Sequence, residues 1–265
     1  MRSKRWALGS GAVFGITVAM VLVVPFTRRH ILGTLRGEPL QNGKYMGEWT
    51  EELADEDLDI RSKAASELAQ LDQRGRPSLP GLAKVMREDK EGRARAGATF
   101  AIYKIANNLR RQGVHATEVL DDLIAALEDR DPVVRMDAAL ALAELEGDAL
   151  KALPALEAGV KRRENKVKAL TFTLTIREQM VTAIGFIGPA AKDALNLLEE
   201  MLDDDEETMR RQAAQSLGKL GPAAKAALPK LKKLVEEDES DIVQSRARDA
   251  IGLIDREEAE KLAEK

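Results

Sequence analysis

Residues 131–145, DPVVRMDAALALAEL, contain the pattern on which most of the chain is built. Apolar side chains follow Arg135 at three, four, seven and ten positions, and these are Ala138, Ala139, Leu142 and Leu145. That spacing places all of them on one face of an α-helix. One such helix cannot bury this face alone, so the pattern indicates packing against similar helices.

The same pattern begins at four other arginines. Successive arginines lie 34, 40, 42 and 33 residues apart. A period of this length indicates an array of helical repeats that stack on one another. The other copies are Arg61 with Ala64, Ala65, Leu68 and Leu71; Arg95 with Ala98, Thr99, Ile102 and Ile105; Arg177 with Met180, Val181, Ile184 and Ile187; and Arg210 with Ala213, Ala214, Leu217 and Leu220.

A second helix is predicted eight residues after the last apolar position of four copies. It begins with a leucine, and in three cases a proline follows, because proline fits the first turn of a helix. Gly-Pro-Ala-Ala-Lys precedes this helix twice, at 188–192 and 221–225, and glycine ends a helix at low cost. The second copy departs from the rule with a longer turn at 107–115. The leucines are Leu79, Leu153, Leu195 and Leu228.

The motif Asp131-Pro132-Val133-Val134-Arg135 followed by two alanines resembles the HEAT-like repeat, in the short form also found in phycobilisome lyases. This resemblance covers residues 44–256 and implies an all-α fold, a right-handed α–α superhelix of about six helix pairs. Residues 241–246 are a loose copy with Arg246 at the arginine position. That alignment puts Asp249 and Arg256 at apolar positions, as expected of a polar end cap.

The residues before the repeats predict a membrane anchor. Residues 7–26 contain no charge and are long enough to span about 30 Å of hydrocarbon as a helix. A buried core helix and a cleaved signal peptide are the alternatives, although no small-residue cleavage site follows the apolar run. Basic side chains are slightly more numerous before it than after it, which favours a single-pass protein of the cytoplasmic membrane with its C-terminal body outside.

The expected organisation is therefore an anchor at 1–30, a flexible tether at 31–43 and a helical-repeat solenoid at 44–265. Gly37, Gly43 and Trp49 also resemble the leader of HEAT-repeat proteins of planctomycetes and related bacteria. We expect Trp49 to cover the open end of the stack rather than to bind a ligand. The glycines and proline of the tether lack helical periodicity.

The composition argues against several kinds of chemistry. The chain has no cysteine and two histidines, His30 and His115, neither in a metal-binding spacing. The HEAT-like deoxyhypusine hydroxylases use His-Glu pairs, and no His-Glu occurs here. Six of the 41 basic side chains but one of the 45 acidic ones lie in residues 1–43, so the body is acidic and nucleic acid is not an expected partner. We expect no catalytic residue, cofactor or metal.

The expected function is a membrane-tethered scaffold that binds a protein partner. The contact surface is expected on the exposed face of the Arg-bearing helices and on two departures from the repeat, the turn at 107–116 and the segment 166–177. A lyase or chaperone-like modifying factor, by analogy with the phycobilisome lyases, and a purely structural spacer remain open. The candidate contact residues are Phe100, Tyr103, Asn107, Phe172, Gln179, Thr182, Arg211 and Gln215.

Overall fold

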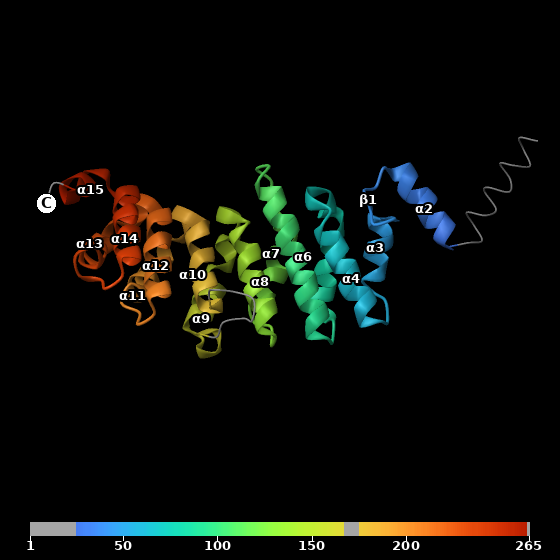
Figure 1. The fold of residues 1–265 in the computed structure, drawn as a ribbon, viewed down its shortest axis with the longest axis horizontal. Helices are drawn as coiled ribbons and strands as arrows, with labels where there is room; N and C mark the ends of the chain where they lie inside the picture. Colours follow the sequence, from blue (N-terminus) through green and yellow to red (C-terminus); the bar gives the residue numbers. More distant parts are fainter. Residues whose placement is uncertain (1–24, 167–174, 264–265) are drawn as a thin grey trace, which may run out of the picture.

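The computed structural model describes residues 25–166 and 175–263. Its helices stand side by side in an elongated array, with α2 at one end and α15 at the other (Figure 1). The predicted all-α repeat architecture is confirmed, and the described residues form six helix pairs.

One layer of the array consists of the Arg-bearing helices. Each packs against the next one along the chain, so that this layer is continuous. The apolar positions predicted from the repeat are buried; Ala138, Ala139, Leu142 and Leu145, for example, have no exposed surface. The Arg-bearing helices are α4 (Leu58–Ala69), α6 (Gly92–Arg110), α8 (Pro132–Ala143), α10 (Ile176–Ile187), α12 (Glu207–Leu220) and α14 (Asp241–Ile254).

The partner helices of the pairs form the second layer. Four of them begin at the leucines predicted from the sequence, which confirms that part of the repeat pattern. The other two are α3, which precedes the first repeated arginine, and α7, which follows the long turn of the second repeat. The helices of this layer are α3 (Met46–Glu52), α5 (Leu79–Glu88), α7 (Leu120–Ala126), α9 (Leu153–Lys161), α11 (Leu195–Met201) and α13 (Leu228–Glu237).

Short 3-10 segments connect the two layers. Four of them have seven residues and start in the same way, with a positive φ at the residue that follows the last apolar position of the Arg-bearing helix. Glycine occupies two of these sites, Gly188 and Gly221, whereas Asp72 and Glu146 occupy the other two. The 3-10 segments are η1 (Asp72–Ser78), η2 (Thr117–Val119), η3 (Glu146–Ala152), η4 (Arg163–Lys166), η5 (Gly188–Ala194) and η6 (Gly221–Ala227).

The alignment predicted for the last repeat is wrong by two residues. Gln244, not Arg246, occupies the arginine position of α14, because its Nε2 donates to the carbonyl of Asp238 six residues earlier. Arg210 makes the same bond to the carbonyl of Asp204. With this register three of the four apolar positions are Ala247, Ile251 and Ile254, all buried, and the fourth is the exposed Arg248, so the last repeat is less eroded than expected.

Residues 31–43, expected to be a flexible tether without helical periodicity, contain regular structure. Helix α2 (Pro25–Arg36) continues through the first part of this segment, and β1 (Leu40–Gln41) pairs antiparallel with β2 (Lys44–Tyr45) in a small hairpin. Gly33 is buried against Tyr45, close enough that an added Cβ would lie 2.4 Å from the Cγ atom of Tyr45.

Trp49 lies at the first end of the stack, as expected. It is 1% exposed, and its Nε1 donates to the carbonyl of Gln41 in the hairpin at 2.9 Å. The ammonium of Lys44 lies 4.4 Å from the ring centroid. The indole is therefore a structural part of the cap at this end.

The other end of the stack is covered by a final helix, α15 (Arg256–Ala263). Its Ala259 and Leu262 pack against the core. The predicted anchor at residues 7–26 lies, except for Pro25 and Phe26, outside the described residues. Within the part of the chain that is described, no helix is both long and apolar enough to span a bilayer.

Candidate partner-binding surface

The repeated arginines form a ladder of ion pairs along one edge of the stack. In three of them the guanidinium reaches an aspartate at or just after the end of the next helix of the second layer, and it also donates to carbonyls five and six residues before it. Three rungs have the same form: Arg61 to Asp89 at 2.6 Å, Arg95 to Asp129 at 2.8 Å and Arg210 to Asp238 at 2.7 Å. These arginines are largely buried and therefore hold adjacent repeats together rather than face a partner.

The ladder also sets the protonation of its aspartates. Hydrogen bonds from Arg210 hold the pKa of Asp238 below its usual value. Burial opposes the ionisation of Asp129, but its hydrogen bonds with Arg95 and the Asp131 amide outweigh burial, so its pKa is also lowered. The same balance lowers the pKa of Asp89.

The ladder changes at the middle of the molecule. Asn165 takes the place of the aspartate opposite Arg135, and its Oδ1 accepts from Arg135 Nε at 2.9 Å. Burial and the charge of Arg162 lower the pKa of Arg135. In the next rung Arg177 pairs with Asp204 at 2.7 Å and donates to the carbonyl of Val160. The rung without a carboxylate directly precedes segment 166–177, which departs from the repeat.

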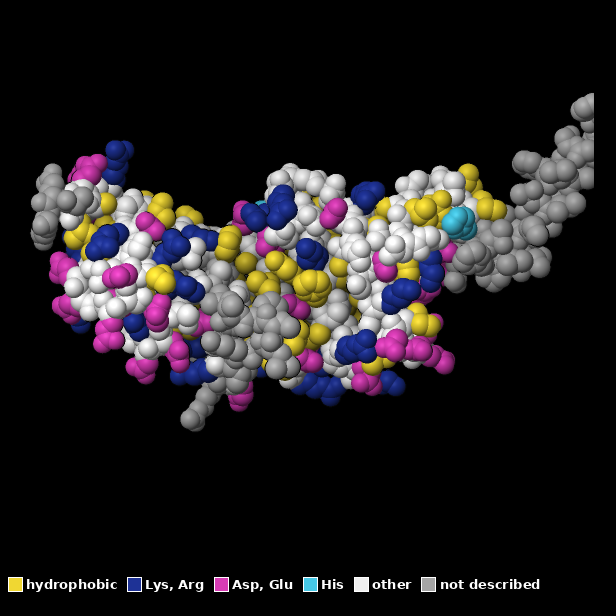
Figure 2. Space-filling model, viewed as in Figure 1, with side chains coloured by type: hydrophobic (Ala, Val, Ile, Leu, Met, Phe, Trp, Pro, Cys, Tyr) yellow, Lys and Arg dark blue, Asp and Glu magenta, His cyan; other side chains and the backbone are white. Residues whose placement is uncertain are grey.

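Four Arg-bearing helices contribute to a surface that we call the Arg-helix face. Figure 2 shows hydrophobic side chains gathered at the middle of this surface, over α6 and α8. The face comprises residues at two, five, eight and nine positions after the arginines of these helices, together with Asn107 and Arg211; all members named below are half-buried or exposed except Asp137, which is buried. Its members discussed below are Phe100, Tyr103 and Asn107 on α6; Asp137, Leu140 and Glu144 on α8; Gln179, Thr182 and Phe186 on α10; and Arg211, Gln215 and Lys219 on α12.

The structure places the described candidate residues on this face but brings only two of them into contact. Phe100 is 44% exposed, and its ring centroid lies 6.1 Å from that of Tyr103. The Thr182 hydroxyl donates to the carbonyl of Glu178 within its own helix, so it is already bonded. Phe172 lies outside the described residues. The remaining candidates are spread over three helices: Asn107, Gln179 and Arg211 are half-buried, and Gln215 is exposed.

The exposed face of the Arg-bearing helices was expected as the contact surface, but no residue of α8 was among the candidates, although α8 contributes Asp137, Leu140 and Glu144 to the face. Leu140 is half-buried at the position that corresponds to Phe100 on α6, five residues after the arginine. The repeat pattern could have identified Leu140, because it lies five residues after Arg135, as Phe100 lies five residues after Arg95. It was missed because the candidates were selected as polar or aromatic side chains.

Phe186 and Lys219 were missed as well. The ammonium of Lys219 on α12 lies 2.9 Å from the centroid of the Phe186 ring on α10, which is a cation–π contact. Burial, followed by the charge of Arg110, lowers the pKa of Lys219 to about 8. Both residues lie nine positions after their arginines, so they occupy equivalent places on neighbouring helices.

Asp137 is the most unusual residue of the face. It is 2% exposed, and its Oδ1 has no hydrogen-bond partner. Burial, together with the charge of Asp131, raises its pKa to about 7. The carboxyl is therefore about half protonated at neutral pH in the free protein, whereas an ordinary aspartate is fully ionised there.

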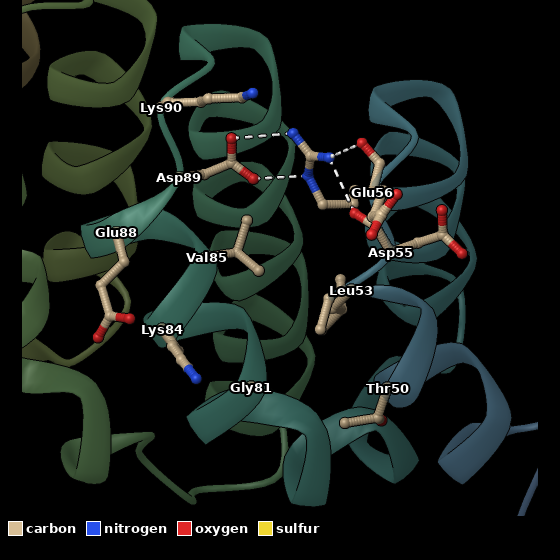
Figure 3. Close-up of a pocket in the computed structure, with 12 residues that line it drawn as sticks. Thr50, Leu53, Asp55, Glu56, Gly81, Lys84, Val85, Glu88, Asp89 and Lys90 are labelled. Carbon is tan, nitrogen blue, oxygen red and sulfur yellow. Dashed lines mark hydrogen bonds and ion pairs between the residues drawn. The ribbon is translucent and has the colours of Figure 1, made fainter.

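A separate cavity of about 630 Å³ opens between the first two repeats, on the second layer (Figure 3). Leu53 and Val85 line its sides, Gly81 leaves it open, and the Arg61–Asp89 pair closes one end. An equivalent hollow of about 420 Å³ lies 149 residues later, where Lys230 replaces Gly81 and donates to Asp203. The cavity is thus a general gap between repeats that a missing side chain enlarges at one junction.

The described residues contain no cluster of three or more His, Asp or Glu side chains arranged to hold a metal ion. The Nδ1 of His115 lies 2.6 Å from a carboxylate oxygen of Asp148, within an exposed turn.

A basic group of lysines on η6 and α13 is neutralised by acidic side chains. These pairs are Lys225 with Asp255, Lys230 with Asp203, Lys232 with Glu258 and Lys233 with Glu237.

Similar solved structures are themselves helical-repeat proteins. A designed armadillo repeat protein in complex with the peptide (KR)4 is 19% identical, with a TM-score of 0.63 over 79% of this chain and 99% of that one. An engineered protein is 21% identical, with a TM-score of 0.62 over 80% and 98%. The CpcE–CpcF complex of phycocyanin lyase from Nostoc sp. PCC7120 is 22% identical, with a TM-score of 0.53 over 81% and 78%. At these identities the likeness shows the fold alone.

No curated protein matches the chain. The family model of HEAT repeats matches residues 79–175 and 173–252, which together are more than half of the sequence. The matched region contains the arginine ladder from Arg95 to Arg210 and the whole Arg-helix face. The protein is a helical-repeat scaffold, and it belongs to the HEAT repeat family.

Proposed function

We propose that the protein is a membrane-tethered scaffold, without catalytic activity of its own, that binds an extended segment of a protein partner along the Arg-helix face. The observation that carries the proposal is the composition of that face. Phe100, Tyr103, Leu140 and Phe186 stay partly exposed there on three neighbouring helices. Partly exposed aromatic residues on one continuous surface are typical of contact sites for proteins.

Two further observations support this surface. The arginines and the apolar repeat positions are occupied by contacts between repeats, which leaves the Arg-helix face as the variable surface of the stack. A similar fold binds a peptide in the designed armadillo repeat protein, which makes an extended segment a reasonable ligand for a stack of parallel helices. Side chains that alternate along such a segment would reach successive helices.

Site-specific photo-crosslinking in the native cells tests the proposal. A photoreactive amino acid replaces Phe100, Gln179 or Gln215 on the face, and Leu150, which is 43% exposed on η3, serves as the control position. We expect the same partner to be crosslinked from the three face positions and not from Leu150. Crosslinking of that partner from Leu150 alone would place the contact elsewhere and would contradict the proposal.

The membrane tether rests on the uncharged residues 7–26. Because the chain has no cysteine, a single Leu35→Cys substitution provides a unique label site, and Leu35 is 77% exposed. We expect the full chain to stay in the membrane after alkaline washing and this cysteine to react with a membrane-impermeant maleimide in intact cells. Release by the wash would contradict the tether, and protection of the cysteine would contradict the orientation.

A further inference from the structure

Among the described residues, Asp137 differs from the other buried acidic side chains, each of which accepts a hydrogen bond. Glu48 accepts from the amide of Tyr45, Glu67 accepts from the side chain of Asn42, and Glu178 accepts from the amide of Thr175. The Oδ1 of Asp137 accepts from nothing. Ionising a buried carboxyl group that has no hydrogen-bond partner costs roughly several kcal/mol. The missing partner of Asp137 therefore needs an explanation.

The repeat geometry places this carboxyl in the seam between α8 and α6. Gly97 holds the equivalent position on α6, and a Cβ there would lie 3.9 Å from Ala65 on the preceding helix. From the same repeat geometry we infer that Asp137 lies opposite Thr99 on α6. The Thr99 hydroxyl donates to the carbonyl of Arg95 at 2.8 Å, so its proton is not available to Asp137.

Phe100 and Tyr103, the aromatic pair of the Arg-helix face, lie on α6, one of the two helices that form this seam. Phe100 follows Thr99 directly. Burial, and then the negative charges of Glu144 and Asp137, raise the pKa of Tyr103, so Tyr103 lies within electrostatic range of Asp137. The other acids around the seam are engaged: Asp131 accepts from the amide of Val133, Glu144 pairs with Arg110, and Glu178 is bonded as above. No cation among the described residues neutralises Asp137.

We propose that Asp137 pairs with a cationic side chain, arginine or lysine, of the protein segment that lies on the Arg-helix face, with Phe100 and Tyr103 flanking the cation. This inference rests on the proposed function and adds the chemistry of the partner. A carboxylate beside two aromatic rings has both elements that stabilise a guanidinium or ammonium group. A single carboxylate offers too few ligands for a metal ion.

Binding of the cation changes the protonation of the site. A partly protonated carboxyl becomes fully ionised when a positive charge is placed next to it, and the proton is released to solvent. Phe100 is 44% exposed, so its side chain can rotate to admit the incoming group from the solvent side.

Two pools of ten-residue peptides test the inference on the full chain. The pools have the same random flanks and differ at one central residue, which is arginine in the first and citrulline, its uncharged analogue, in the second. We expect fluorescence anisotropy to show at least about tenfold tighter binding of the arginine pool to the wild type. Calorimetry at pH 6.5 in two buffers of different ionisation enthalpy should show release of up to about one proton.

The Asp137→Asn variant should bind both pools equally, with the affinity for the citrulline pool unchanged and no proton release. This variant removes a buried charge and should fold. Asp249→Asn, which changes an exposed carboxylate on α14, is the matched control and should keep the preference for arginine. Equal binding of both pools by the wild type, or a preference that survives Asp137→Asn, would overturn the inference and leave the proposed function standing. Binding of neither pool would contradict both.

Discussion

Single arginines connect each repeat to the next one. Arg95 shows how: it is 4% exposed, makes two hydrogen bonds with Asp129 and donates to the carbonyls of Asp89 and Lys90. One side chain therefore fixes the end of its own helix and the end of the next helix of the second layer. Because these ends lie 34 residues apart in sequence, the contact sets the stacking of two repeats.

Replacing Arg95 by alanine should destabilise the protein strongly. The substitution leaves the Asp129 carboxylate buried without its partner, and the loss of one member of a buried ion pair costs about 3–5 kcal/mol. Urea unfolding followed by circular dichroism measures the change. Arg93→Ala is the control, because Arg93 pairs with Asp59 at an exposed site, and its loss should cost no more than about 1 kcal/mol. Equal effects of the two variants would show that the ladder does not stabilise the stack.

Asp137, unlike Arg95, destabilises the folded protein when it is ionised. Its pKa is about 7 in the folded protein and about 3.9 in the unfolded chain, so its destabilising contribution is absent below about pH 4, grows as the pH rises from about 4 to 7 and is complete above pH 7. Asp137→Asn should therefore stabilise the free protein at pH 8 by up to about 4 kcal/mol, and its advantage should shrink towards pH 4. Thermal unfolding across this pH range measures it. A constant difference between the two proteins at all pH values would show that Asp137 titrates normally.

The connecting elements depend on a few backbone conformations. Gly188 and Gly221 adopt φ of 72° and 60° with ψ of −148° and −141°, a combination that only glycine adopts readily. Each ends an Arg-bearing helix and begins the 3-10 segment that leads to the second layer. The identical Gly-Pro-Ala-Ala-Lys sequences therefore produce identical connections.

Gly221→Ala should destabilise the protein by about 1–3 kcal/mol, because alanine must adopt a strained conformation at this connection. Gly252→Ala is the matched control: Gly252 lies inside α14, where the nearest atom to an added Cβ is the Cβ of Ala259 at 3.9 Å. The control should stabilise the protein by about 0.5–1 kcal/mol, because alanine favours helix. Chemical denaturation distinguishes the two, and a neutral Gly221→Ala would mean that the connection relaxes without cost.

At the scale of the whole molecule, the ladder makes stability depend on pH. The folded-state pKa values of Asp89, Asp129 and Asp238 are lowered, so the stability that these groups contribute is fully present above their unfolded value of about 3.9. It is lost as the pH falls through the lowered values. The rungs are spread from the first to the fifth repeat, so acid weakens the stacking along the length of the array.

We therefore expect the midpoint of urea unfolding to fall steeply below about pH 4. The double variant Arg95→Gln with Asp129→Asn replaces one rung by neutral side chains, and it should show a smaller fall than the wild type. An identical acid transition in this variant would mean that other carboxylates dominate the pH dependence.

The sequence by itself determined the repeated elements of this protein. The spacing of alanine and leucine after Arg61, Arg95, Arg135, Arg177 and Arg210 identified the Arg-bearing helices, and the leucines at 79, 153, 195 and 228 marked the starts of their partners. Helical periodicity and the preference of proline for the first turn are local properties, so residues close in sequence reveal them.

Only the tertiary structure decided what depends on contacts between repeats. Gln244 replaces an arginine because the position requires a donor to the carbonyl of Asp238, and any long donor side chain meets that requirement. Hairpin contacts with Tyr45 and Trp49 order residues that have no helical pattern of their own. Asp137 resembles any surface aspartate in the sequence, and its burial without a partner follows from the stacking of α8 against its neighbours. Burial and charge pairing are properties of the assembled stack, because they arise between residues about thirty positions apart.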